Sequence, residues 1–151
     1  MHLHNIRSQE VKSLVKVDGY EVPEGLYYSE EYTWARVENG KVRIGITDYA
    51  QKQLREIVFV ELPNAGDTIT QNEPFGTVES VKAVSDLVAP VSGKIEEVNG
   101  EVGDKPELLN ESPYDKGWLI VVSPTNLDAD LKSLMDFNKA VEWHKSKAKE
   151  G

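Results

Sequence analysis

The chain of 151 residues contains no cysteine and only three histidines. Without cysteine there is neither a disulfide framework nor a thiolate nucleophile, so any redox chemistry must come from a cofactor. Two of the histidines, His2 and His4, lie at the amino terminus with no third ligand nearby, and a metal site is not expected there. The third, His144, is expected to be a semi-exposed residue of a helix and not a ligand.

Long apolar runs are also missing. No stretch approaches the length of a membrane span, and the opening MHLHNIRSQE lacks the hydrophobic region of a signal peptide. Glu10 and Asp18 argue against a transit peptide, which is poor in acids. We therefore expect a cytoplasmic protein that contacts no membrane, with a mature organellar form as the alternative.

Motifs of common enzymes are absent as well. The sequence has no glycine-rich phosphate loop, no serine elbow and no paired metal ligands at productive spacing. Glu96 and Glu97 lie on a predicted strand, where neighbouring side chains point to opposite faces, so they are not expected to form a catalytic carboxylate pair. These absences argue against an enzyme.

Charge of one sign dominates part of the chain. The net charge is −9, and the segment from Glu61 to Asp115 holds twelve acids against three bases, which accounts for the whole excess. Such a chain lacks the basic footprint that nucleic-acid binding requires. We hypothesise that the acidic segment steers basic partner surfaces; a solvated face that only serves solubility is the alternative.

The most informative stretch that is present is GTVESVKAVSDLVAP, from Gly76 to Pro90. The runs 75–78 and 87–89 suit β-strands, so the residues between them must reverse the chain and place Lys82 at a hairpin tip. The neighbours of Lys82, which are Val81, Ala83 and Val84, are small or branched, whereas a tight turn would favour Asn-Gly, so the tip is suited to present a side chain. A lysine in a turn is by itself usually only a solvated surface residue.

The sequence Glu79-Ser80-Val81-Lys82-Ala83 resembles the attachment motif of the glycine cleavage H proteins, whose lysine carries lipoic acid in amide linkage. Biotin carriers instead place the lysine between methionines, and the lipoyl domains of 2-oxoacid dehydrogenases usually have aspartate before it. The resemblance implies that Lys82 binds lipoic acid covalently. It also implies an attachment hairpin formed by the flanking residues Glu79, Ser80, Val81, Ala83 and Asp86.

The resemblance extends over roughly residues 28–141, with matching stretches at 45–51, 57–63 and 113–118. It implies a carrier that takes an aminomethyl group from a pyridoxal-phosphate-dependent glycine decarboxylase and offers it to a folate-dependent aminomethyltransferase. Dihydrolipoyl dehydrogenase would reoxidise the arm, and lipoate-attaching enzymes would modify Lys82. We expect the chain to be a monomer.

One position departs from the family. Tyr32-Thr33-Trp34 occupies the place of a His-Glu-Trp motif whose glutamate helps to hold the amine of the loaded arm in a surface cleft. Thr33 supplies no carboxylate, so Glu30, Glu31 or another acid would have to replace it. The alternative is an H-like lipoate-binding protein of a heterodisulfide-reductase-like sulfur-oxidation pathway, or a lipoyl relay protein. A third possibility is an unmodified H-like adaptor.

Local patterns predict the remaining elements. We expect an amphipathic helix over residues 1–16, a turn at 22–25, a hairpin of strands 32–37 and 41–46 around Asn39-Gly40, a helix from Thr47 or Asp48 to Arg55, a strand at 57–61, and two helices after Ser123-Pro124.

Two similar segments, 66–78 and 103–122, bracket the Lys82 hairpin and suggest two β units related by a pseudo-twofold axis. The predicted fold is mainly β within the α+β class, a barrel-sandwich hybrid with short helices and a C-terminal helical segment. Trp34 and Trp118 are expected to anchor its core. The predicted organisation is an N-terminal extension (1–25), a lipoyl-carrier domain (26–123) and C-terminal helices packed on that domain (124–151).

Overall fold

A computed structural model describes residues 14–150 of the chain. Its strands are β1 (Leu14–Val17), β2 (Tyr20–Pro23), β3 (Tyr27–Tyr28), β4 (Thr33–Glu38), β5 (Lys41–Ile46), β6 (Ile57–Glu61), β7 (Thr68–Ile69), β8 (Pro74–Ser80), β9 (Val84–Val88), β10 (Gly93–Val98) and β11 (Ile120–Pro124). Its helices are α2 (Asp48–Leu54), α3 (Glu101–Asp104), α4 (Leu108–Glu111), α5 (Leu127–Lys132) and α6 (Phe137–Glu150).

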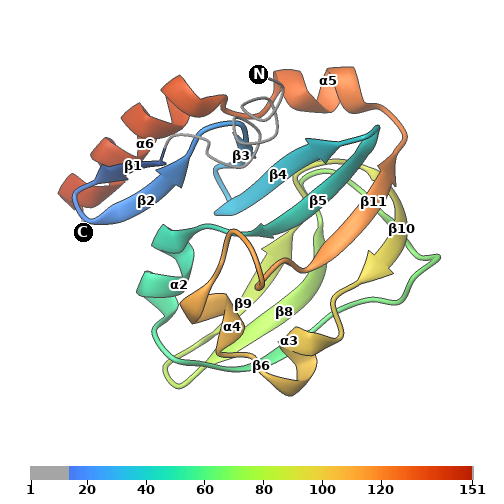
Figure 1. Ribbon diagram of the computed structural model, residues 1–151, viewed down its shortest axis with the longest axis horizontal. Helices are drawn as coiled ribbons and strands as arrows, with labels where there is room; N and C mark the ends of the chain where they lie inside the picture. Colours follow the sequence, from blue (N-terminus) through green and yellow to red (C-terminus); the bar gives the residue numbers. More distant parts are fainter. Residues whose placement is uncertain (1–13, 151) are drawn as a thin grey trace, which may run out of the picture.

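Two sheets form the body of the molecule. One has six strands in the order β3-β4-β5-β11-β10-β7, and the other has three in the order β6-β8-β9. The paired strands are antiparallel, and the two sheets pack on either side of one apolar core (Figure 1). This arrangement confirms the predicted mainly β barrel-sandwich architecture, in which each sheet covers the apolar face of the other.

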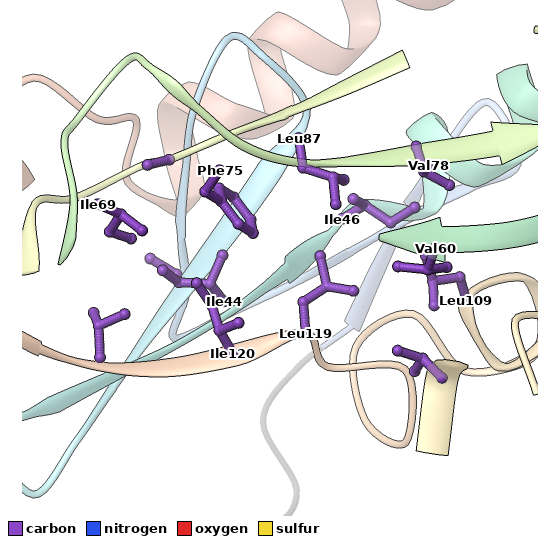
Figure 2. Packing of buried hydrophobic residues seen from close by; sticks show 14 of the residues in the cluster. Ile44, Ile46, Val60, Ile69, Phe75, Val78, Leu87, Leu109, Leu119 and Ile120 are labelled. Atoms are coloured by element: carbon purple, nitrogen blue, oxygen red, sulfur yellow. The ribbon is translucent and has the colours of Figure 1, made fainter. Parts of the chain in front are cut away.

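The core between the sheets consists of aliphatic side chains from alternate strand positions, together with Phe75. Figure 2 shows how they interlock, with Ile46 of β5 between Leu87 of β9 and Val78 of β8, and Ile44 of β5 below Phe75. Ile44, Ile46, Val78 and Leu87 are each at most 3% exposed. Burial of such a side chain contributes about 1.5–3 kcal/mol, so this interface accounts for much of the stability of the fold.

The hairpin of β4 and β5 and the helix that follows it form as predicted. Asn39 and Gly40 both have positive φ, 52° and 78°, as the two central residues of a type I′ turn require. Thr47 caps α2, because its Oγ1 accepts a hydrogen bond of 3.1 Å from the backbone N–H of Ala50.

Three β-bulges change which residues of the strands face the solvent. The register shifts between Ile57 and Phe59 in β6, between Pro74 and Gly76 in β8, and between Ile95 and Glu97 in β10. A bulge adds one residue to a strand and so reverses the alternation of its faces. The prediction that Glu96 and Glu97 point to opposite faces is therefore wrong: both side chains are exposed.

The N-terminal predictions are wrong in part within the described residues. Leu14 and Val15 belong to strand β1 and not to a helix. Val22 and Pro23 lie in β2, so the turn predicted at 22–25 is confined to Glu24 and Gly25. Asp18 and Gly19, both at positive φ, make the tight turn of this hairpin. The rest of the predicted helix, and His2 and His4, lie outside the described residues.

The β1–β2 hairpin packs against helix α6, which lies alongside it in Figure 1. Together they enclose a second apolar cluster around Trp34, which includes the buried residues Val17, Val22, Leu26, Tyr28 and Ala140. Trp34 is fully buried, as predicted, and its indole Nε1 donates a hydrogen bond of 3.0 Å to the backbone oxygen of Pro113. Trp118 is only partly buried, and the guanidinium of Arg43 lies 4.7 Å from the centre of its ring.

Helices α5 and α6 confirm the predicted C-terminal helical segment. The internal repeat is only partly reflected in the structure. Gly66 and Asp67 form a turn before strand β7, whereas Gly103 and Asp104 lie in helix α3. The second segment therefore contains helical turns where the first contains a short strand.

Candidate functional site

Lys82 lies at the tip of the hairpin formed by β8 and β9, as predicted, and its side chain is exposed. The last cross-strand pair is Glu79 with Val84, so residues 80–83 make the reversal. In Figure 1 this tip lies at the lower left, near the C-terminal end of α2 and far from the β4–β5 turn at the upper right.

Ser80 holds the turn together from within. Its Oγ accepts hydrogen bonds from the backbone N–H groups of Lys82 (3.2 Å) and Ala83 (3.1 Å), while its own N–H donates to the backbone oxygen of Ala83 (2.8 Å). A further bond, from the N–H of Val81 to the oxygen of Glu56 (3.0 Å), ties the tip to the start of β6. Ser80 is 6% exposed, so these bonds are shielded from water.

The acids that flank Lys82 in sequence do not pair with it. Glu79 faces Phe59 and Val84 across the sheet, and Asp86 faces Thr77. Among the ion pairs of residues 14–150, none involves Lys82. The ammonium of Lys82 is thus held by no partner in the described part of the chain, which leaves it free to react.

A cleft of about 270 Å³ opens beside β9, the strand that follows Lys82. Its apolar lining comes from α2 and from core positions of both sheets, and its polar lining includes two exposed acids, Glu31 and Asp86. The full lining consists of Glu31, Tyr32, Thr33, Ile46, Tyr49, Ala50, Gln53, Leu54, Val78, Ser85, Asp86 and Leu87.

Thr33 lines this cleft but is 1% exposed, and its hydroxyl is already occupied. Its Oγ1 donates a hydrogen bond of 3.1 Å to the backbone oxygen of Val88 and lies 2.7 Å from the Oγ of Ser29. Thr33 therefore ties the start of β4 to the end of β9. Of the two neighbouring acids considered as replacements for a carboxylate here, Glu31 lines the cleft and Glu30 does not.

Sequence reasoning did not anticipate the aromatic wall of the cleft. Tyr32 and Tyr49 stack with their ring centres 5.6 Å apart. The ring of Trp143 in α6 packs on Tyr32, with 5.4 Å between the ring centres. Tyr32 has φ of +73°, a conformation that a bulky residue rarely adopts and that tends to occur at functional positions. The one available signal was the tyrosine at position 32, next to the departure at Thr33.

His144 lies behind this wall and corrects a prediction: it is fully buried and not semi-exposed. Its Nδ1 is 2.7 Å from the backbone oxygen of Ala140, while its Nε2 has no hydrogen-bond partner among the described residues. The rings of Tyr28, Tyr49 and Trp143 surround it. Burial among these rings lowers the pKa of His144 below its usual value, because the charged imidazolium would lose its hydration.

The hairpin presents an exposed primary amine, that of Lys82, on a turn held by hydrogen bonds. An amine of this kind can attack an activated carboxyl group to form an amide, and the ordered strands on each side hold the attachment point while a long appendage stays mobile. Within residues 14–150 no cluster of three potential metal-binding side chains occurs, and no helix is both long and apolar enough to cross a membrane.

Comparisons with known proteins identify the family. The family model described as glycine cleavage H-protein matches residues 26–147. The glycine cleavage system H protein of Geobacillus sp. (strain WCH70) is 56% identical over 129 residues, which cover 85% of this chain and 98% of that protein. The corresponding protein of Brevibacillus brevis is 59% identical over 119 residues, covering 79% and 94%.

A solved structure is similar as well. The crystal structure of a glycine cleavage system H protein from Mycobacterium marinum superimposes with a TM-score of 0.75 at 36% sequence identity. The match covers 82% of this chain and 98% of that one.

Proposed function

The chain belongs to the glycine cleavage H-protein family, and on that premise we propose that it is the lipoyl carrier of a glycine cleavage system, with Lys82 as its single attachment site. The observation that carries the proposal is the placement of Lys82: an exposed, unpaired amine at the tip of a hairpin that Ser80 holds in place. The protein acts as a substrate of its partner enzymes.

The residues of the hairpin fit a lipoyl group in amide linkage. The amine stands free of the sheet, and acylation would remove its positive charge without breaking an ion pair of the described residues. When bound, the group would supply a dithiolane that can be reduced and can carry an aminomethyl cargo. Glu79, Val81, Ala83 and Asp86 complete the attachment hairpin around Lys82 and Ser80.

The cleft beside β9 would receive the free end of the arm. Its apolar walls suit an aliphatic chain, and Glu31 and Asp86 place carboxylates at the surface where a cationic cargo needs a partner. In this proposal Glu31 replaces the carboxylate that Thr33 lacks. The departure at Thr33 then changes which residue holds the cargo and not which cargo is carried.

The partners we propose are the enzymes that attach lipoate, glycine decarboxylase, the aminomethyltransferase and dihydrolipoyl dehydrogenase. We also propose that the protein works as a monomer in the cytoplasm. The names of its relatives favour this role over the sulfur-oxidation alternative, because those relatives are glycine cleavage proteins.

Intact mass of the protein from its native host tests the attachment site. We expect the mass added by one lipoyl group on the wild type and none on Lys82→Arg, which keeps the positive charge but offers no acylable amine. An unmodified wild type from cells competent for lipoylation would contradict the proposal and favour the adaptor role. Loading of the modified protein by glycine and glycine decarboxylase then tests the cargo, and failure to load would favour the sulfur carrier.

A further inference from the structure

The outer face of the three-stranded sheet β6-β8-β9 exposes an unusual number of apolar side chains. Six large hydrophobic residues of the described chain are exposed, and four of them lie on this sheet or its turn: Val58 (43%), Phe59 (52%), Val81 (64%) and Val84 (67%). A group of exposed apolar side chains next to a reactive group often marks an interaction site.

The register of the sheet places these residues together. Phe59 pairs with Glu79, and Glu79 pairs with Val84, so the three side chains form one row across the outer face. Val81 follows at the tip, next to Lys82. We call these four apolar residues, with Glu79 between them, the hairpin platform.

The bulge in β6 creates part of the platform. With regular alternation Phe59 would point inward with Ile57, but the bulge turns both Val58 and Phe59 outward while Ile57 and Val60 stay buried. A continuous apolar run such as Ile57–Val60 would be buried on both faces if it served only the core. Half of it is instead presented to the solvent beside the lysine.

Acids surround the platform. Glu61, Glu79 and Asp86 are all exposed, while Lys82 is the one base in the strands and turn of this sheet; Arg55 and Glu56, both exposed, precede β6 and balance each other in charge. A second copy of the chain would bring like charges together here, which disfavours self-association. The occupant that fits is a different protein, with an apolar patch bordered by lysine or arginine.

We propose that the hairpin platform is the docking surface for the enzyme that acylates Lys82. Before modification the amine stands on a stem of only four carbons, so its partner must rest on the sheet itself. Later partners are reached by the long lipoyl arm and need not touch the platform. The inference rests on the proposed lipoyl attachment.

The reaction at this surface is an acyl transfer. The amine of Lys82 attacks the acyl carbon of a lipoyl adenylate, which the enzyme makes from lipoate and ATP. An amide bond forms, the bond between the acyl carbon and the phosphate oxygen breaks, AMP leaves, and the nitrogen releases one proton to water.

The test measures initial rates of lipoyl transfer by a purified ATP-dependent lipoate ligase, with the unmodified full-length protein as the varied substrate. We expect Phe59→Thr, and likewise Val84→Thr, to raise the KM for the protein about tenfold with little change in kcat, because each removes apolar contact area. Val37→Thr is the matched control: Val37 is also exposed (39%) but lies on β4, away from the hairpin.

The outcomes separate this inference from the proposed function. Equal KM values for Phe59→Thr and Val37→Thr, with urea unfolding confirming that both are folded, would overturn the docking surface while leaving lipoylation intact. A wild type that accepts no lipoyl group would overturn the proposed function itself. A wild-type dimer that Phe59→Thr dissociates, seen by sedimentation, would assign the platform to a second copy and also overturn the inference.

Discussion

A single buried hydroxyl, that of Ser80, organises the turn on which Lys82 stands. It bonds to the N–H groups of the two residues after Val81, which lack the Asn-Gly chemistry that would make the turn on their own. The conformation of the turn around Lys82 is thus stabilised by Ser80.

We predict that Ser80→Ala destabilises the protein by about 1–2 kcal/mol, because two shielded N–H groups lose their acceptor. Amide hydrogen exchange at Lys82 and Ala83 should accelerate, and urea unfolding measures the stability loss. The control is Ser85→Ala on β9, whose hydroxyl lies 3.5 Å from the nearest acceptor and should contribute little. Equal effects of both variants would contradict this role of Ser80.

In the proposed function, Glu31 supplies the carboxylate that holds the aminomethyl group, in place of the family glutamate. We predict that Glu31→Gln lowers the fraction of lipoylated protein that carries the aminomethyl group after incubation with glycine and glycine decarboxylase, by about three- to tenfold. A cationic cargo without a carboxylate partner is less well held. Intact mass measures the loaded fraction, and lipoylation at Lys82 should stay complete.

The neighbouring Glu30 provides the control, since it is also exposed but does not line the cleft. Glu30→Gln should load like the wild type. If both variants load normally, another acid of the cleft, Asp86, holds the cargo. Thr33→Glu is a poor rescue by itself, because it would remove the hydrogen bonds that Thr33 makes with Ser29 and Val88.

At the scale of elements, helix α6 packs behind the aromatic residues that line the cleft. It brings Trp143 against Tyr32 and buries His144 among three rings. The position of this helix, and with it the shape of the aromatic wall, depends on keeping the imidazole of His144 neutral. Acid should therefore loosen α6.

We predict that the free energy of unfolding decreases as the pH falls through about 6.5 and continues to decrease until the pH reaches the lowered pKa of His144. In this window the unfolded chain binds the proton more readily than the folded one, which gives a slope of at most about 1.4 kcal/mol per pH unit. His144→Phe keeps a buried ring but binds no proton, so it should lack this component of the pH dependence. Urea unfolding from about pH 8 to about pH 5 compares the two proteins, and identical profiles would contradict the prediction.

At the scale of the whole molecule, negative charge is concentrated in one segment of the chain. The nine excess negative charges lie between Glu61 and Asp115, a segment that includes the hairpin and the strands around it. We propose that residues 26–123 are the carrier domain and that residues 14–25 and 124–150 fold with it, since Val22 and Ala140 are buried in one cluster with Trp34.

We predict that association of the lipoylated protein with glycine decarboxylase slows about tenfold between low and moderate salt, because screening weakens the attraction between the acidic segment and a basic partner surface. Stopped-flow measurements at several salt concentrations give the rates. Rates that do not change with salt would leave the acidic segment a role in solubility only.

Much of the fold was predictable because its signals are local. Asn39-Gly40 predicted the turn between β4 and β5, and Thr47 predicted the cap of α2. The apolar periodicity after Pro124 predicted the two C-terminal helices. The Lys82 hairpin followed from two apolar runs that must meet. The β1–β2 hairpin differs from the prediction because two local signals conflict there: Leu14 and Val15 have a helix-like spacing, whereas Asp18-Gly19 favours a tight turn between strands.

The sequence by itself therefore determined the family and the mainly β architecture, and it predicted Lys82 as the attachment lysine, since each rests on a motif or a period within a short stretch. Only the tertiary structure decided which acids line the cleft, which partners the hydroxyl of Thr33 binds, and which apolar residues of β6 face the solvent. Those outcomes depend on contacts between segments far apart in the chain, such as Thr33 with Val88, and on a bulge whose register no local pattern reveals.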